Sequence, residues 1–210
     1  MGRTEILYPY GRYGYTRGNG KTWHGGIDLV ALDDKTIRMP FYYRGGTFKK
    51  ITGTVTRARI VHNRADKTWE WGWYVCVQLD DNQTPDDVNF LYFCHCSRLL
   101  VSVGQKVSSG DALAIIGQTG NAAGGYDHTH LVARATATGT GVNPTAYSGT
   151  DNAVGVYGAA DDGSTEQIST QPTGKTMQCI MVGPLDAAAA AKCDALATQL
   201  ELVGAGRYYS

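Results

Sequence analysis

Short apolar runs between turn-forming residues constrain the fold of this chain more than any other sequence feature. The runs cover residues 52–60, 71–79, 89–96, 112–117 and 130–135, and turn signals such as Asp-Asp-Asn-Gln, Val-Gly-Gln and Ala-Gly-Gly lie between them. Runs of this kind are typical of strands, whereas a helix shows a longer stretch with a period of about 3.6 residues. The 27 glycines among 210 residues also indicate many turns. We therefore predict a mostly β domain with antiparallel sheets, not a helical bundle.

The composition of the chain changes after residue 148. Residues 149–176 are small and polar, as in a flexible linker. Within 177–210, the apolar run 177–182 predicts a strand, and Asp186 is a suitable N-cap for a helix that ends near Val203. A piece of about 34 residues rarely folds alone. We expect one domain over 1–148, a linker over 149–176, and a small α/β module over 177–210 that is truncated or self-associates.

Charge and composition exclude several classes of partner. Residues 1–148 hold 16 Lys and Arg against 12 Asp and Glu, a net charge of +4, while 149–210 hold 3 against 7, a net charge of −4. The positive charge fits an anionic polymer, but it lacks the basic stripe that nucleic-acid binding needs. No run reaches the roughly 20 apolar residues of a membrane span. The five irregularly spaced cysteines predict reduced thiols.

Three of the five histidines stand in two arrangements suited to chemistry. His24 and Asp28 are four residues apart, and Gly25-Gly26 between them predicts a turn that folds the carboxylate back beside the ring. His128 and His130 alternate along a predicted strand, so both side chains point to the same side. Imidazole nitrogens and a carboxylate oxygen suit Zn²⁺, which keeps one position for water in catalytic sites.

Several short motifs in this order carry a family resemblance. They are the H-x-x-x-D of His24–Asp28, the aromatic-x-His-x-Ser of Phe93–Ser97, the V-x-x-G-x-x-V-x-x-G type of stretch over 101–110, the G-x-T-G of 117–120, the H-x-H of His128–His130, and Asn143-Pro144. Over roughly residues 5–148, the chain resembles the lysostaphin/LytM family of zinc endopeptidases, which cut bacterial peptidoglycan.

The resemblance implies a fold, a cofactor and a set of site residues. The fold would be the antiparallel β-sheet catalytic domain of the lysostaphin/LytM type, known as the duplicated hybrid motif. One Zn²⁺ per domain would be held by His24, Asp28 and His130. His128 would be the general base, and His95 would orient water or stabilise the oxyanion. The substrate would be the peptide cross-links or stem peptides of peptidoglycan.

Some residues depart from the family pattern, and the role of others can be interpreted in two ways. After His130 the chain continues with Leu-Val-Ala, where the family often has an aromatic residue and an acid. Cys94 and Cys96 flank His95, and strand alternation predicts that both are buried thiols that point away from it. Residues 69, 71 and 73 are alternating tryptophans that would share one face of a strand, as a substrate-binding wall or as core.

Alternative functions and settings also follow from the sequence. The stretch 103–113 resembles the hairpins of biotinyl and lipoyl carrier domains, but Lys106 is not at a hairpin tip as a carrier requires. A non-catalytic relative with a cell-wall-binding or regulatory role is a second alternative, and the module 177–210 resembles cell-wall-binding repeats at the level of the fold. Residues 1–12 lack the apolar run of a secretory signal. We expect a phage lysin that moves from the host cytoplasm to the wall or travels on the virion, with an extracellular autolysin whose leader was removed as the alternative.

Overall fold

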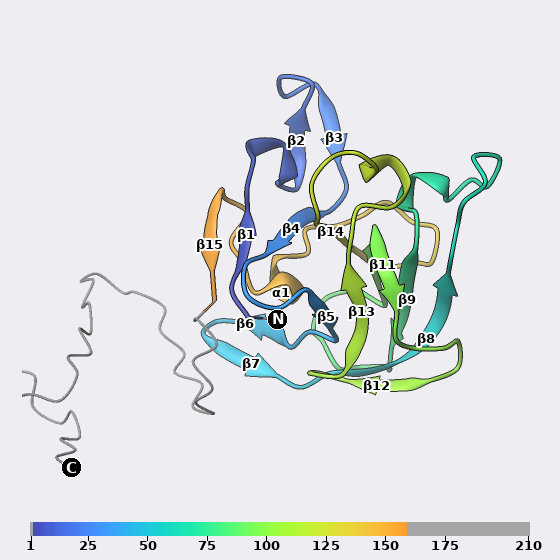
Figure 1. Ribbon diagram of the computed structural model, residues 1–210. Coiled ribbons are helices and arrows are strands. Elements are labelled where there is room, and N and C mark those ends of the chain that lie inside the picture. The colour runs from blue at the N-terminus through green and yellow to red at the C-terminus, as the bar shows by residue number, and fades with distance from the viewer. Residues whose placement is uncertain (1, 159–210) are drawn as a thin grey trace, which may run out of the picture. The chain divides into compact units, whose positions relative to one another are not determined.

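The computed structural model describes residues 2–158, which form a mostly β domain (Figure 1). This confirms the predicted fold class. The strands are β1 (Thr4–Ile6), β2 (Gly14–Arg17), β3 (Thr22–His24), β4 (Ile27–Ala31), β5 (Thr36–Arg38), β6 (Tyr42–Arg44), β7 (Thr47–Lys49), β8 (Thr52–Arg59), β9 (Tyr74–Leu79), β10 (Phe90–Cys94), β11 (Cys96–Leu99), β12 (Lys106–Ser108), β13 (Ala112–Ile116), β14 (Thr129–Arg134) and β15 (Gly155–Tyr157). The helical pieces are short: the 3₁₀ turns η1 (Pro9–Gly11), η2 (Trp69–Trp71) and η3 (Gly120–Ala122), and the helix α1 (Thr145–Ser148).

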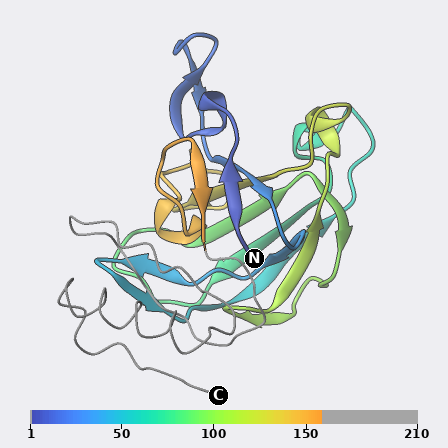
Figure 2. The same ribbon diagram turned by 60° about the vertical axis from the view of Figure 1, so that its left-hand side comes forward.

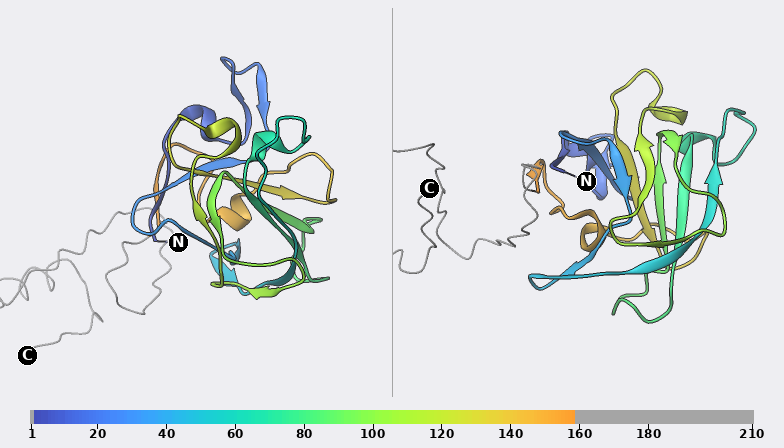
Figure 3. Two further views of the ribbon diagram at one scale, coloured as in Figure 1. Left: turned by 45° about the vertical axis from the view of Figure 1, so that its right-hand side comes forward. Right: turned by 60° about the horizontal axis from the view of Figure 1, so that its bottom comes forward.

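Two sheets carry most of the domain. The larger has eight strands in the order β12-β8-β9-β10-β14-β4-β1-β15, and every neighbouring pair is antiparallel. The smaller has the order β11-β13-β5, and β2-β3 and β6-β7 are separate hairpins. The hairpin β2-β3 projects beyond the sheets (Figure 2). The segments with η2 and η3 lie at the same end of the fold and contact each other (Figure 3).

Side-chain alternation divides the large sheet into two faces. One face contributes Ile27, Leu29, Phe93 and Leu131 to the main core, which also contains residues of the small sheet. The opposite face carries a second buried cluster, whose fully or nearly buried members are Val61, Tyr74, Cys76, Tyr92, Cys94 and Val132. On β14, His130 alternates with the core residue Leu131, so it faces the side of the second cluster.

The chain passes from the large sheet to the small sheet at His95. The predicted run 89–96 is therefore two strands. Strand β10 pairs with β9 and β14 in the large sheet, and β11 pairs with β13 in the small sheet. His95 has a φ of +65°, a left-handed backbone conformation that costs a non-glycine residue about 1–3 kcal/mol. Cys94 and Cys96 are buried free thiols, as expected. They do not share one face, as alternation along a single strand predicts, because the break places Cys94 in the second cluster and Cys96 in the main core.

The three tryptophans do not alternate on one strand. Trp69 and Trp71 begin and end η2, and strand β9 starts only at Tyr74. Trp69 and Trp71 pack against the second cluster, whereas Trp73 packs against the main core. The expectation of one shared face is corrected, because a left-handed Gly72 (φ +63°) ends η2 and turns the chain between them.

The folded part extends past the expected boundary at residue 148. Strand β15 pairs antiparallel with β1, and Thr150 is buried. Asn152 bonds to the backbone of Tyr13, accepting from its N–H at 2.8 Å and donating to its carbonyl at 3.0 Å. Residues 149–158 therefore belong to the domain, which corrects the start of the predicted linker. The remaining linker and the module 177–210 lie outside the described residues. Within residues 2–158, no helix is long and apolar enough to cross a membrane.

Candidate metal centre

A tight turn brings His24 and Asp28 together. Strand β3 ends at His24 and β4 begins at Ile27, with Gly25 and Gly26 between them. His24 Nε2 lies 3.2 Å from Asp28 Oδ1, as the predicted turn requires. A Cβ atom on Gly26 would lie 2.7 Å from His130 Cε1 and would also collide with the Leu131 carbonyl. Glycine is needed here for the close approach of β14, not for an unusual backbone angle.

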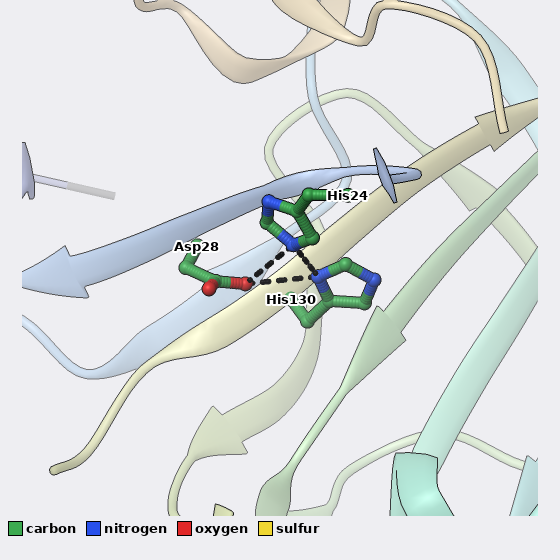
Figure 4. Close-up of side chains that lie close together, drawn as sticks. All are labelled: His24, Asp28 and His130. Carbon is green, nitrogen blue, oxygen red and sulfur yellow. Dashed lines mark hydrogen bonds and ion pairs between the residues drawn. The ribbon is translucent and has the colours of Figure 1, made fainter. Parts of the chain in front are cut away.

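His130 completes a group of three potential metal ligands (Figure 4). It lies directly opposite Asp28 in the β14-β4 ladder, although the two residues are 102 positions apart. Its Nδ1 is 2.9 Å from Asp28 Oδ1 and 3.0 Å from His24 Nε2. His24 and Asp28 are 2% and 3% exposed. Two nitrogens and one oxygen therefore converge in a nearly dry setting.

His128 and His95 lie beside this group, and backbone carbonyls hold their rings. His128 Nδ1 donates to the carbonyl of Tyr126 at 3.0 Å, and its Nε2 is 3.9 Å from Asp28 Oδ1. His95 Nδ1 donates to the carbonyl of Thr119 at 2.9 Å, and its ring centroid is 4.9 Å from that of His128. A carbonyl can only accept, so each Nδ1 carries the proton and each Nε2 keeps a lone pair.

Burial and hydrogen bonds set the protonation of three of these groups. Burial alone would raise the pKa of Asp28, but the neighbouring imidazoles of His130 and His24 outweigh it and hold this pKa well below its ordinary value. Burial lowers the pKa of His95 to about 3, and the neighbouring His130 and His128 add to this effect. Burial also lowers the pKa of His130. Asp28 is therefore a carboxylate, and His95 and His130 are neutral imidazoles at neutral pH.

Three further contacts at the site could not be found from the motifs. The carbonyl of Arg12 accepts a hydrogen bond from His24 Nδ1 at 2.7 Å, which leaves Nε2 as the free ring nitrogen. Arg17 Nη2 is 2.8 Å from Asp28 Oδ2. Tyr126 stacks on His128, with ring centroids 4.6 Å apart. The sequence shows no signal for Arg17, and Tyr126 is marked only by its place two residues before His128.

The three donors fit a zinc ion. Zn²⁺ accepts imidazole nitrogens and carboxylate oxygens, and catalytic zinc sites have three protein ligands and one open position. His24, Asp28 and His130 offer two nitrogens and one oxygen within 4.8 Å of one another. The Arg12 carbonyl orients the His24 ring in the manner usual for a metal-bound histidine. By donor chemistry, these residues could hold Zn²⁺.

Fold and site together define an antiparallel β domain with a His/Asp/His group where the hairpin β2-β3 joins strands β4 and β14 of the large sheet. Residues 50–144 match the family model described as Peptidase family M23. The matched segment contains His95, His128 and His130 but not His24 or Asp28. His24 and Asp28 precede the matched segment, and the fold brings them next to His130.

Several solved structures are similar to this domain. The catalytic domain of lysostaphin from Staphylococcus simulans has 19% identity and a TM-score of 0.46, and the match covers 65% of this chain and 86% of that one. A variant of the catalytic domain of the prophage-encoded M23 protein EnpA from Enterococcus faecalis has 24% identity and a TM-score of 0.47, with 66% and 88% covered. A zinc-containing peptidase from Vibrio cholerae has 20% identity and a TM-score of 0.37, with 60% and 31% covered.

Lys106 offers no support for a carrier domain. It begins strand β12, and its Nζ is 3.1 Å from Asp80 Oδ1. The side chain is exposed, but the residue lies in a sheet ladder opposite Thr54 rather than at the tip of a turn.

Proposed function

We propose that this chain is a zinc-dependent endopeptidase that hydrolyses peptide bonds in bacterial peptidoglycan. The observation that carries the proposal is the convergence of His24 Nε2, Asp28 Oδ1 and His130 Nδ1 beside two further histidines. The match of residues 50–144 to the model of a peptidase family supports peptide hydrolysis as the reaction. When bound, zinc supplies a Lewis acid for the scissile carbonyl and a water molecule with a pKa of about 7.

The protein's own groups would handle protons and orientation. His128 has its proton on Nδ1, and its lone pair on Nε2 faces the ligand group, so it can accept a proton from the attacking water. His95 is neutral and also keeps a lone pair at Nε2, so it can accept a hydrogen bond but not donate one there. We therefore assign His95 to the orientation of water rather than to stabilisation of the oxyanion.

The test of the reaction is digestion of purified cell walls with different cross-links. We expect new amino termini in the peptide part of the wall, loss of activity after dialysis against a strong chelator, and recovery after zinc is added. Mass spectrometry of the released fragments identifies the bond that is cut. Release of glycan fragments without new amino termini would contradict the proposed endopeptidase.

Two variants separate a ligand from a base. Asp28→Ala removes the oxygen donor, so the variant should lose both bound zinc and activity. His128→Ala leaves the three donors in place, so it should keep one zinc per chain and lose about 10²–10⁴-fold in rate. Zinc is measured by elemental analysis on the samples used for kinetics. Full loss of zinc in His128→Ala would assign this residue to the ligands instead.

A further inference from the structure

Arg17 contacts the side of Asp28 that faces away from the imidazoles. Asp28 Oδ1 is within 3.2 Å of the donor nitrogens of His24 and His130, while Oδ2 is 2.8 Å from Arg17 Nη2. The two oxygens of this buried carboxylate therefore have different partners. A second hydrogen bond, from Arg17 Nε to the Tyr10 carbonyl at 3.3 Å, anchors the guanidinium at its other edge.

An irregularity in the hairpin β2-β3 aims Arg17 at this carboxylate. Gly14 pairs with His24 and Tyr15 with Trp23, but the register then shifts so that Arg17 pairs with Thr22. Thr22 and His24 are two residues apart on one strand, so they share a face, and Arg17 joins that face. In a regular ladder, Arg17 would share the face of Tyr15 instead. Bulges near active sites often redirect a side chain in this way.

The extra residue of the bulge is Thr16, and its side chain is bonded. Thr16 Oγ1 donates to the Arg12 carbonyl at 2.8 Å, and the same carbonyl accepts from His24 Nδ1 at 2.7 Å. The Arg12 carbonyl therefore holds both the ring of His24, a candidate metal ligand, and the side chain of Thr16 in the bulge. The hairpin and the ligand group are thus connected at two points.

We propose that Arg17 is a positioning residue for the metal site: it holds Oδ2 of Asp28 so that Oδ1 is directed at the cation. The inference rests on the proposed zinc function. It adds the hairpin β2-β3 to the parts of the chain on which metal affinity depends, although Arg17 is not itself a ligand. Partners of metal ligands typically change metal affinity by about 10–100-fold when they are removed.

A positive side chain beside a cation also has an opposing effect. Repulsion between Arg17 and the ion weakens binding, so removal of the charge alone would strengthen it. The Arg17 side chain is 38% exposed, so solvent and salt screen this repulsion. The Asp28 carboxylate is 3% exposed, so a lost partner there is not replaced easily by water. We expect the loss of orientation to outweigh the relief of repulsion.

The experiment measures zinc affinity directly, without activity. Apo-protein is titrated with Zn²⁺ against a chromophoric chelator for the wild type, Arg17→Gln and Arg17→Lys. The control is Arg59→Gln, which removes an arginine of comparable exposure that is paired with Asp66 (2.7 Å) at a different part of the chain. Circular dichroism checks that each variant is folded. We expect Arg17→Gln to bind zinc about 10–100-fold more weakly, and the control to bind as the wild type does.

The lysine variant distinguishes orientation from charge. Lys keeps the charge but cannot make both bonds of the guanidinium, so positioning predicts an affinity between those of the wild type and Arg17→Gln. Equal or tighter binding by Arg17→Gln, with Arg17→Lys equal to the wild type, would overturn the inference. Failure of the wild type to bind zinc would instead reject the proposed function. A change in the visible spectrum of bound Co²⁺ in Arg17→Gln would independently support altered ligand geometry.

Discussion

At the scale of single residues, Gly26 shows how closely the ligand strands approach. A side chain at this position would meet the imidazole of His130, the carbonyl of Leu131 and the side chain of Val132. Gly25, its neighbour, has only ordinary contacts at 3.7 Å or more. Neither glycine has a left-handed backbone, so an alanine at either position is not strained by backbone angles. The two positions therefore differ in space alone.

This difference predicts opposite outcomes for two similar variants. Gly26→Ala should displace His130 and weaken zinc binding by at least about tenfold, because metal ligands must be held in position. Gly25→Ala should leave zinc binding close to that of the wild type. Titration with a zinc-competing chelator measures both, and thermal unfolding reports any general loss of stability. Equal zinc affinity in the two variants would contradict a close approach at Gly26.

At the scale of elements, β15 protects one edge of the large sheet. Its three residues pair with Thr4, Glu5 and Ile6 of β1, which would otherwise be the edge strand. The connection from α1 to β15 is also bonded, through Asn152 to Tyr13 and through a hydrogen bond between the hydroxyls of Ser148 and Thr150 at 2.8 Å. Exposed edge strands invite pairing with other chains.

The boundary of the domain can be tested with two shortened chains. A chain that ends at residue 158 should unfold cooperatively and keep its metal site. A chain that ends at 148 loses β15 and the Asn152 bonds, so its free energy of unfolding should fall by about 2 kcal/mol or more. Urea unfolding measures the difference, and light scattering should show more association of the shorter chain. Equal stability of the two chains would restore the linker boundary at 149.

At the scale of the whole molecule, the candidate metal site joins segments that are distant in sequence. His24 and Asp28 come from β3 and β4, and His130 comes from β14, 106 positions after His24. The ligand group exists only when the sheet is assembled. A ligand that binds only the folded state stabilises it by an amount that depends on its concentration and dissociation constant.

Zinc should therefore raise the thermal stability of the domain. Free zinc at about a hundred times its dissociation constant should add about 2.7 kcal/mol to the free energy of unfolding. Chelator should reverse the gain, and Asp28→Ala should unfold at the same temperature with and without zinc. Differential scanning calorimetry at fixed pH provides the measurement. A wild-type Tm that does not respond to zinc would mean that the ion does not bind the folded site.

The β class and the five histidine and aspartate candidates could be predicted from sequence alone, because strands and ligand motifs are local. Runs bounded by turns indicate strands, and H-x-x-x-D and H-x-H already place pairs of side chains together. The sequence could not show the break at His95, because alternation assumes a continuous strand, and the left-handed residue follows from the chain crossing between sheets. For the same reason, alternation wrongly predicts one shared face for the two flanking cysteines and one for the three tryptophans.

Which distant groups meet depends on the tertiary structure. Arg17 reaches Asp28 because a bulge shifts the register of a hairpin, and no local pattern around Thr16 predicts that shift. Gly26 is required because β14 lies against the turn, a contact between residues about a hundred positions apart. The polar composition after 148 hid β15, because a three-residue edge strand needs backbone pairing with β1 rather than an apolar run. Long-range pairing, which depends on the assembled sheets, accounts for each of these differences.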